Sequence, residues 1–226
     1  MSAGNSSRPQ LVIAVDGPSG SGKSSISKES AKRLGLEFLD TGAMYRAFTW
    51  FCLSENIENN ESAIKCLNDK IFHLEISTSA NEEKISVNDR DLTLEIRKDG
   101  VTAKVSFYAA IPEVRKFMVE KQRAIVKVSK KGIIVEGRDI GSVVLPDADY
   151  KIFITASEEV RAKRRALQND SDAKDVLELQ RQRDLIDSNR KVSPLSIPEG
   201  AVILDNTELN FEQSVQSLLN IVKKNS

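Results

Sequence analysis

The chain has 226 residues, and its 33 Lys and Arg residues balance 33 Asp and Glu residues, so the formal net charge is zero. A neutral chain has no general basic field to hold nucleic acid, so a small ligand is the better expectation. The longest apolar runs fall far short of the roughly 18 residues that a membrane-spanning helix needs. Two cysteines and one histidine give no basis for a disulfide scaffold or a metal centre.

The first ten residues, MSAGNSSRPQ, are polar and lack the apolar segment of a secretory signal. We therefore expect a disordered lead-in over residues 1–10 and a cytoplasmic protein. The remaining length is enough for one α/β domain with a sizeable core, so residues 11–226 are expected to form a single domain. Cys52 and Cys66 both lie in helical patterns and are expected to be free, buried thiols.

A glycine-rich turn follows the first apolar segment. Residues 12–15 predict a buried strand and residues 22–34 a helix, and the turn between them reads Gly17-x-x-x-x-Gly22-Lys23-Ser24, the pattern of a phosphate-binding loop in its required context. Glycines let backbone N–H groups turn toward phosphate oxygens, and a helix N-terminus favours an anion. A turn with a chance lysine is the alternative. The residues expected to hold a nucleoside triphosphate are Gly17, Pro18, Ser19, Gly20, Ser21, Gly22, Lys23, Ser24 and Ser25.

The segment after this helix predicts a short strand over residues 36–39 and then a turn. Thr41 is expected to cap the following helix, which carries Arg46. Another helix should end near residue 70. The pattern then changes to period two, which predicts a small antiparallel sheet inserted over roughly residues 71–95. Its strands are expected at residues 73–77, at residues 84–88 and around Leu92 and Leu94.

The second half of the chain alternates strands with helices, which predicts a doubly wound parallel sheet of five strands. Further strands are expected at residues 132–136, 150–154 and 201–204, and helices within 96–130, starting anew at Pro112, and at 158–169, 173–189 and 211–224. Ligands bind at the carboxyl ends of such strands. The loop at Gly17, the turn at Thr41 and the Arg138-Asp139 pair should therefore line one cleft.

Several arginines lie where they could face that cleft. Arg46 and Arg138, at element ends opposite a phosphate-binding loop, indicate a second phosphate, the alternative being ordinary surface ion pairs. Arg161 and Arg165 are four residues apart on one predicted helix face, beside Arg164. They could form a mobile lid that brings guanidinium groups over a transferring phosphoryl group, or simply a solvated helix face.

Six segments in order carry a resemblance to a known family: VDGPSGSGKSS, LDTGAMYR, IPEVR, VEGRDIGSVVLPDA, ASEEVRAKRRALQ and RDLIDSNRKVSPL. Together they resemble the bacterial cytidylate kinases over nearly the whole chain from Leu11. The loop alone is shared with very many proteins, whereas DTGAxYR and EGRDIG are far more selective. The insert after Lys70 also fits, because these enzymes resemble adenylate kinase with an enlarged monophosphate subdomain.

The resemblance implies that the chain transfers the γ-phosphoryl group of ATP to CMP or dCMP with Mg²⁺, in pyrimidine nucleotide metabolism. ATP would bind the loop. The residues implied around the monophosphate are Thr41, Arg46, Ser106, Arg115, Arg138, Asp139, Asp187 and Arg190. Among them, Arg46 and Arg138 would hold the phosphate, Ser106, Arg115 and Asp139 would read the base, and Asp187 and Arg190 would contact the sugar. The implied catalytic residues are Lys23, Arg161, Arg165 and Arg183.

Two positions depart from the family pattern. Many relatives have glycine and then threonine after the loop lysine, where this chain has Ser24 and Ser25. Either hydroxyl could help to hold Mg²⁺, directly or through water. Thr41 replaces the serine that is common at its position and keeps the hydroxyl.

The base assignment agrees with the chemistry of cytosine, which offers an amino donor at N4 and acceptors at N3 and O2. A carboxylate such as Asp139 accepts from N4, and arginine and serine donate to the acceptors. Another kinase of the same fold, for UMP, thymidylate or shikimate, is the first alternative. A GTPase-like switch and an ATP-binding protein without turnover are the others, but no guanine-reading [NT]-K-x-D segment occurs in a suitable place.

The resemblance also divides the domain into three parts. The core would comprise residues 11–40, 131–157 and 191–226, the acceptor region residues 41–130 with the insert at 71–95, and the lid residues 158–190. The expected partners are the small-molecule substrates ATP and CMP or dCMP, with no nucleic acid and no membrane. No heptad pattern or long apolar patch is visible, so a monomer is expected.

Overall fold

The computed structural model describes residues 11–169, 172–190 and 192–223, so the predicted lead-in over residues 1–10 and Lys224 lie outside the described residues. Five strands form the main sheet in the order β2-β6-β1-β7-β8, and every neighbouring pair is parallel. The strands are β1 (Val12–Asp16), β2 (Glu37–Asp40), β6 (Ile133–Gly137), β7 (Tyr150–Thr155) and β8 (Val202–Asp205). The predicted parallel sheet is confirmed.

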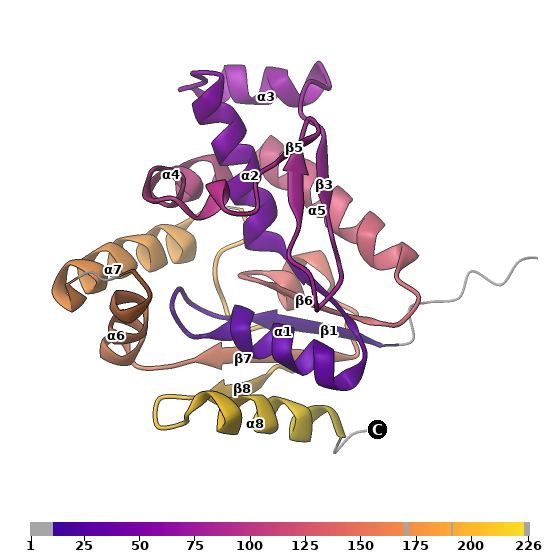
Figure 1. The fold of residues 1–226 in the computed structure, drawn as a ribbon, viewed down its shortest axis with the longest axis vertical. Helices are drawn as coiled ribbons and strands as arrows, with labels where there is room; N and C mark the ends of the chain where they lie inside the picture. Colours follow the sequence, from indigo (N-terminus) through magenta and orange to yellow (C-terminus); the bar gives the residue numbers. More distant parts are fainter. Residues whose placement is uncertain (1–10, 170–171, 191, 224–226) are drawn as a thin grey trace, which may run out of the picture.

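The central strand β1 is buried on both faces, as its unbroken apolar sequence requires. Ile13 and Val15 pack in the core under α1 (Lys23–Leu34) and α8 (Phe211–Lys223). Val12 and Ala14 face the other way, into the core that contains α2 (Thr41–Ser54) and α5 (Pro112–Val128). Helices therefore cover both faces of the sheet (Figure 1), and the carboxyl ends of the strands stay open to ligands.

The loop after β1 depends on its glycines. Gly17, Gly20 and Gly22 have φ angles of 155°, 76° and 82°, which side chains other than glycine rarely adopt. A Cβ atom on Gly17 would also lie 2.0 Å from the carbonyl oxygen of Ile154 in β7. The glycine spacing read from the sequence therefore reflects both backbone conformation and a close approach to the neighbouring strand.

A second, antiparallel sheet has the order β3-β4-β5 and lies apart from the main sheet. Its strands are β3 (Leu74–Ile76), β4 (Ile85–Val87) and β5 (Arg90–Asp91). The predicted insert is confirmed, but its third strand lies just before Leu92 rather than around Leu92 and Leu94. Leu92 is instead fully buried in the core, and Leu94 is exposed. The apolar side chain of Leu92 therefore serves core packing, and neither leucine marks a strand.

The part of the chain between β2 and β6 is mainly helical. Besides α2 and α5 it contains α3 (Asn60–Asn68), a short 3₁₀ helix at Glu95–Arg97 and α4 (Asp99–Ala109). Phe48, Phe51, Phe72 and Tyr108 pack as edge-on and tilted ring pairs at its centre. This aromatic cluster joins α2 to α4 and to the segment before β3, so it fixes the helices that carry Arg46 and Ser106.

The cap of α2 differs from the sequence expectation. Asp40, in an extended conformation, caps the helix, and its carboxylate accepts from the backbone N–H of Ala43 at 2.9 Å. Thr41 already has its place in the first turn, and its hydroxyl donates to the carbonyl of Glu136 at 2.8 Å. The prediction that Thr41 caps α2 is therefore wrong, because Asp40 precedes it and is as good a cap.

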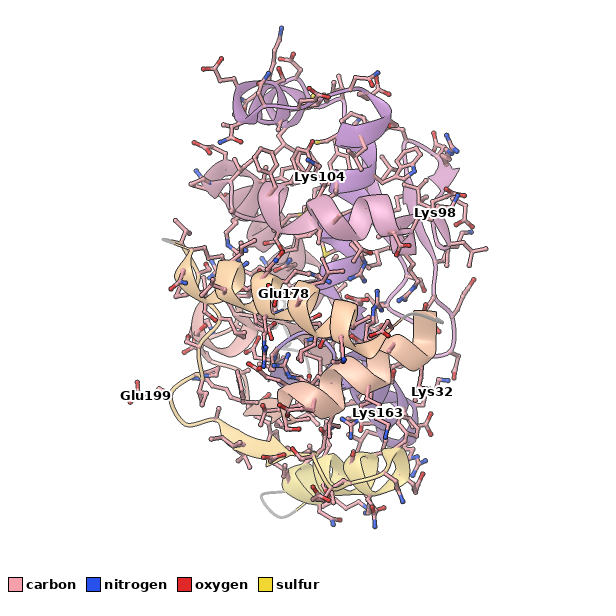
Figure 2. All side chains as sticks on the ribbon, turned by 90° about the vertical axis from the view of Figure 1, so that its left-hand side faces the viewer. Lys32, Lys98, Lys104, Lys163, Glu178 and Glu199 are labelled. Atoms are coloured by element: carbon pink, nitrogen blue, oxygen red, sulfur yellow. The ribbon has the colours of Figure 1, made fainter. Side chains whose placement is uncertain are left out.

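Two further helices, α6 (Glu158–Asn169) and α7 (Ala173–Asn189), follow β7 and pack against each other. Figure 2 views them from the front, between α4 with Lys104 above and α8 below. A π-helical turn, Ile140–Val144, follows β6. Across the described parts of the chain, none of the helices combines the length and apolar character needed to cross a membrane.

Candidate active site

One cavity of about 760 Å³ opens at the carboxyl ends of β1, β2 and β6 and reaches to α4, α5 and α7. It confirms the prediction that these strand ends share a cleft. The predicted site residues that line it are Ser19, Gly20, Gly22, Lys23, Ser24, Ser25, Thr41, Arg46, Ser106, Arg115, Arg138, Asp139, Arg165, Arg183, Asp187 and Arg190. Gly17, Pro18, Ser21 and Arg161 are not part of its lining.

The buried loop lysine lies in a small network of polar groups around the buried carboxylate of Glu136. The Nζ atom of Lys23 donates to the carbonyl of Pro18 at 3.0 Å and lies 3.5 Å from the carboxylate of Glu136. The hydroxyl of Ser24 donates to the other oxygen of Glu136 at 3.0 Å. Burial lowers the pKa of Lys23 to about 8, and the nearby Arg138 lowers it too. An arriving phosphate would raise this pKa, because a nearby negative charge favours the charged lysine.

Sequence reasoning missed Glu136 as a functional residue. It ends the apolar run of β6, where a charged residue on a fully buried strand is unusual enough to have served as a signal. Burial raises the pKa of its carboxyl. Carboxylate and hydroxyl oxygens are the ligands that Mg²⁺ prefers, and it is usually held by one or two such groups together with water and substrate phosphates. Glu136 and Ser24 fit that donor set. The described residues contain no cluster of three or more His, Cys, Asp or Glu side chains that could hold a metal.

Arg161 lies behind the loop rather than inside the cavity. Its guanidinium donates to the carbonyls of Ser19 and Ala156 at 2.8 and 3.1 Å and forms an ion pair with Asp184. Asp184 in turn accepts from the backbone N–H of Ser19 at 3.1 Å. In this conformation Arg161 braces the loop from α6.

Arg164, which sequence reasoning placed beside Arg161 and Arg165 but not among the candidate site residues, lines the cavity at the loop end. It donates to the side chain and the carbonyl of Asn206 at 2.9 Å. The amide of Asn206 donates to the carbonyl of Ser21 in the loop at 2.9 Å. The cavity wall continues along the segment after β8 through Leu209, Asn210, Phe211 and Ser214. A polar, turn-forming stretch after the last strand was the available signal.

The far end of the cavity is built on a buried ion pair between Arg115 of α5 and Asp139. Both side chains are almost fully buried, at 3% and 6% exposure. Arg115 also donates to the carbonyl of Ala109 at 3.2 Å and lies 5.4 Å from the centre of the Tyr45 ring. Ser106 of α4 lines the same end. The structure thus brings together the three residues predicted to read a base.

The arginines in the middle of the cavity are also paired. Arg46 lies 2.9 Å from the carboxylate of Asp40, and Arg138 lies 3.2 Å from that of Asp187. Arg190 lies 3.7 Å from the second oxygen of Asp187. The two arginines predicted to hold the acceptor phosphate therefore have carboxylate partners, and a phosphate would have to replace or supplement them.

Arg165 and Arg183 differ from this group, because neither makes an ion pair with any residue that the structure describes. The Nε atom of Arg183 is buried without a hydrogen-bond partner there. Burial lowers the pKa of Arg183 to about 10, and the nearby Arg138 adds to the effect. Burial and Arg46 likewise lower the pKa of Arg165. Two partly buried arginines without an ion-pair partner among the described residues, beside this loop, are suited to bind an anion.

Sequence reasoning also missed Asp16, at the end of β1, which joins the loop to the turn after Asp139. Its carboxylate accepts from the backbone N–H groups of Ile140 and Gly141 at 2.7 and 2.8 Å. It is fully buried, and burial raises its pKa to about 6. The residue directly before the loop thereby fixes the turn directly after Asp139.

Comparisons with known proteins point to one family. The family described as "Cytidylate kinase" matches residues 13–224. A cytidylate kinase from Caldanaerobacter subterraneus subsp. tengcongensis is 44% identical over 223 residues, covering 96% of each chain. One from Streptomyces avermitilis is 43% identical and covers 96% of this chain and 94% of its own. An uncharacterised protein from Eubacterium ventriosum, solved as a crystal structure, has a TM-score of 0.55 at 11% identity, covers 96% of this chain and 99% of its own, and supports the fold alone.

Proposed function

The chain belongs to the cytidylate kinase family and transfers the γ-phosphoryl group of ATP to CMP or dCMP, and we propose that the main cavity holds both nucleotides at once, each at its own end. The observation that carries this proposal is the continuity of the cavity from the loop around Lys23 to the buried Arg115–Asp139 pair. Transfer between two phosphates needs them in line and in contact. A single cavity with cations along its length provides that arrangement.

ATP binds at the loop end in this proposal. The backbone N–H groups of residues 17–25 and the Nζ atom of Lys23 hold its phosphates. Arg164 and the segment from Asn206 to Phe211 form the wall for its nucleoside. Ser24 or Ser25, with Glu136, would hold the Mg²⁺ that accompanies ATP, directly or through water. When bound, this ion neutralises charge on the phosphate oxygens.

CMP binds at the far end. Arg46 and Arg138 take its phosphate, and Asp187 and Arg190 contact its sugar. Asp139 accepts from the N4 amino group, while Arg115 and Ser106 donate to N3 and O2, and Thr41 lies beside the phosphate. In UMP the group opposite Asp139 is an oxygen, so two pairings fail. Each mispairing costs roughly 1–3 kcal/mol, which is enough for about hundredfold discrimination when combined.

The reaction needs no protein nucleophile, because an oxygen of the CMP phosphate attacks the γ-phosphorus of ATP. Positioning and charge neutralisation dominate such a transfer. Arg165 and Arg183 supply positive charge over the transferring group, which explains why they have no carboxylate partners among the described residues. Arg161 contributes by bracing the loop and, if the lid at residues 158–190 rotates, by approaching the phosphates. The proposed division into core, acceptor region and lid follows this assignment.

A monomer suffices in this proposal, because every assigned residue belongs to the cavity of one chain or to the segments that brace it. The test is an assay of ADP release with ATP and Mg²⁺ against CMP, dCMP, UMP, AMP, GMP and dTMP. Strong preference for CMP and dCMP is expected. Activity that is broad, or highest with UMP, would overturn the roles given to Asp139, Arg115 and Ser106 while leaving the loop assignment intact.

A further inference from the structure

One carboxylate outside the main cavity bridges two regions of the protein. Glu83 lies in the segment between β3 and β4, and one of its oxygens is 2.6 Å from the Nζ atom of Lys28 on α1. The other oxygen accepts from Arg97 at 2.8 Å. All three side chains are partly exposed, Arg97 the most, at 52%. The assignment of substrate roles above leaves this bridge without a purpose.

Arg97 belongs to the main cavity, whereas Glu83 does not. The arginine lines the main cavity together with Asp40, Arg46 and Arg165, and it also lines a smaller neighbouring cavity of about 350 Å³. Glu83 lines only the smaller one. Burial would raise the pKa of Asp40, but Arg46 and Arg97 are among the groups that hold it below its ordinary value. Arg97 therefore acts on the carboxylate that positions Arg46.

The two kinds of ion pair in this neighbourhood differ in how easily they open. Arg115 and Asp139 are buried, so separating them would strand a charge. Arg97 and Glu83 are both in contact with water, and such a pair is weak and is further screened by salt. If Arg97 leaves, Glu83 keeps Lys28. No buried charge loses its partner, so an anion in the cavity that binds Arg97 more strongly can replace Glu83 as its partner.

We propose that Arg97 is a further phosphate-binding residue for the acceptor nucleotide, and that Glu83 holds it in the nucleotide-free protein and competes with the phosphate for it. The inference rests on the proposed placement of CMP at the far end of the main cavity. A phosphate dianion is the only part of CMP with the charge to compete for this guanidinium. The sugar and base are neutral and gain nothing from it.

Opposite effects follow from the two substitutions. Arg97→Ala should raise the Kd for CMP about tenfold, the value of one charge-assisted hydrogen bond. Glu83→Gln should lower the Kd about two- to threefold, because the competing charge is gone and the weak surface pair no longer has to open. The double variant should behave like Arg97→Ala, because Glu83 acts only through Arg97. If the bridge were merely structural, both single variants would weaken binding.

The experiment is isothermal titration calorimetry of the full chain with CMP and with cytidine, which lacks the phosphate. Cytidine affinity should be the same in all variants. Lys98→Ala is the matched control: Lys98 is the next residue, is 67% exposed, pairs with Glu95 and lies at the start of α4 (Figure 2). It should leave the Kd for CMP unchanged.

Three results would overturn the inference: equal or same-direction changes in Arg97→Ala and Glu83→Gln, a parallel change in cytidine binding, or the same loss in Lys98→Ala. Failure of the unsubstituted protein to bind CMP would instead overturn the proposed function, and the inference with it. Opposite changes confined to CMP would support both.

Discussion

The two ends of the main cavity carry their positive charge in different ways. At the acceptor end, Arg46, Arg115 and Arg138 each face a carboxylate already present in the protein. On α6 and α7, Arg165 and Arg183 make no such pair with the residues that the structure describes, and burial lowers the pKa of both. The acceptor end is therefore organised before a nucleotide arrives. We propose that Arg165 and Arg183 obtain an anionic partner only when a triphosphate binds.

This difference explains how one cavity can be both stable and responsive. Paired arginines are fixed in direction, which is what reading a base requires, because each donor must meet its acceptor without reorganisation. Unpaired arginines gain free energy when a polyanion enters, so under the proposed function they would link the position of α6 and α7 to ATP binding. We expect substitutions at the two ends to separate stability from activity.

The largest effect is expected at the loop. Lys23→Ala should reduce kcat at least about hundredfold, because the transferring phosphates lose a preorganised charge in a desolvated site. Steady-state ADP release and a thermal unfolding curve test this together. Lys32→Ala, on the exposed side of the same helix (Figure 2), is the matched control and should keep full activity. A folded Lys23→Ala protein with near-normal kcat would contradict the loop assignment.

The next effect sharpens the contrast between paired and unpaired arginines. Arg115→Met should lower the free energy of unfolding by about 3–5 kcal/mol, because the charge of Asp139 is left buried alone. Arg183→Met removes a desolvated cation without stranding a described partner, so unfolding should change little or become harder. Urea unfolding without nucleotide measures both, and ADP release should fall in both. Equal destabilisation would show that the two ends are not organised differently.

Base reading gives a smaller, more specific change. Asp139→Asn keeps the shape of the side chain but adds a donor, so it can face the oxygen of UMP. The preference for CMP over UMP in kcat/KM should fall about tenfold or more. Thr155→Ser, on β7 and outside the cavity lining, provides a conservative control. An unchanged preference would mean that Asp139 does not read the base.

Much of this site could be predicted from the sequence because it is encoded locally. The loop, the Arg138-Asp139 pair and the strand ends follow from short motifs and from the rule that ligands bind at strand carboxyl ends. The contacts of Asp16, Glu136 and Arg97 could not be predicted. The partners of the Asp16 and Glu136 carboxylates are 112 to 125 positions away, and the partner of Arg97 lies on an insert whose packing is not periodic. Arg161 and Arg164 show the limit of helical spacing. They are three residues apart on α6, yet Arg161 contacts the back of the loop and Arg164 lines the cavity, and only the packing of α6 decides which does which.

The smallest effect concerns Asp16, which links the loop to the turn after Asp139. Its pKa is about 6 in the folded protein because of burial, well above the 3.8 of an exposed carboxyl. Between these values the folded state binds the proton more tightly than the unfolded state, so this group stabilises the protein fully below pH 3.8, and that contribution is lost as the pH rises through 6. When the pH falls from 7 to 5, the free energy of unfolding of the unsubstituted protein should therefore rise by about 1 kcal/mol more than that of the Asp16→Asn variant.

Urea unfolding of both proteins at the two pH values measures this difference, in which the titration of other carboxylates cancels. Asp149→Asn is a useful control. Asp149 also accepts a backbone N–H bond, but its donor is Val12, at the opposite end of β1 from Asp16. A constant gap between the native protein and Asp16→Asn across this range would mean that Asp16 is ionised throughout. Asp16, which links the loop to the turn after Asp139, would then carry a permanent negative charge, and both of these segments would have to be organised around it.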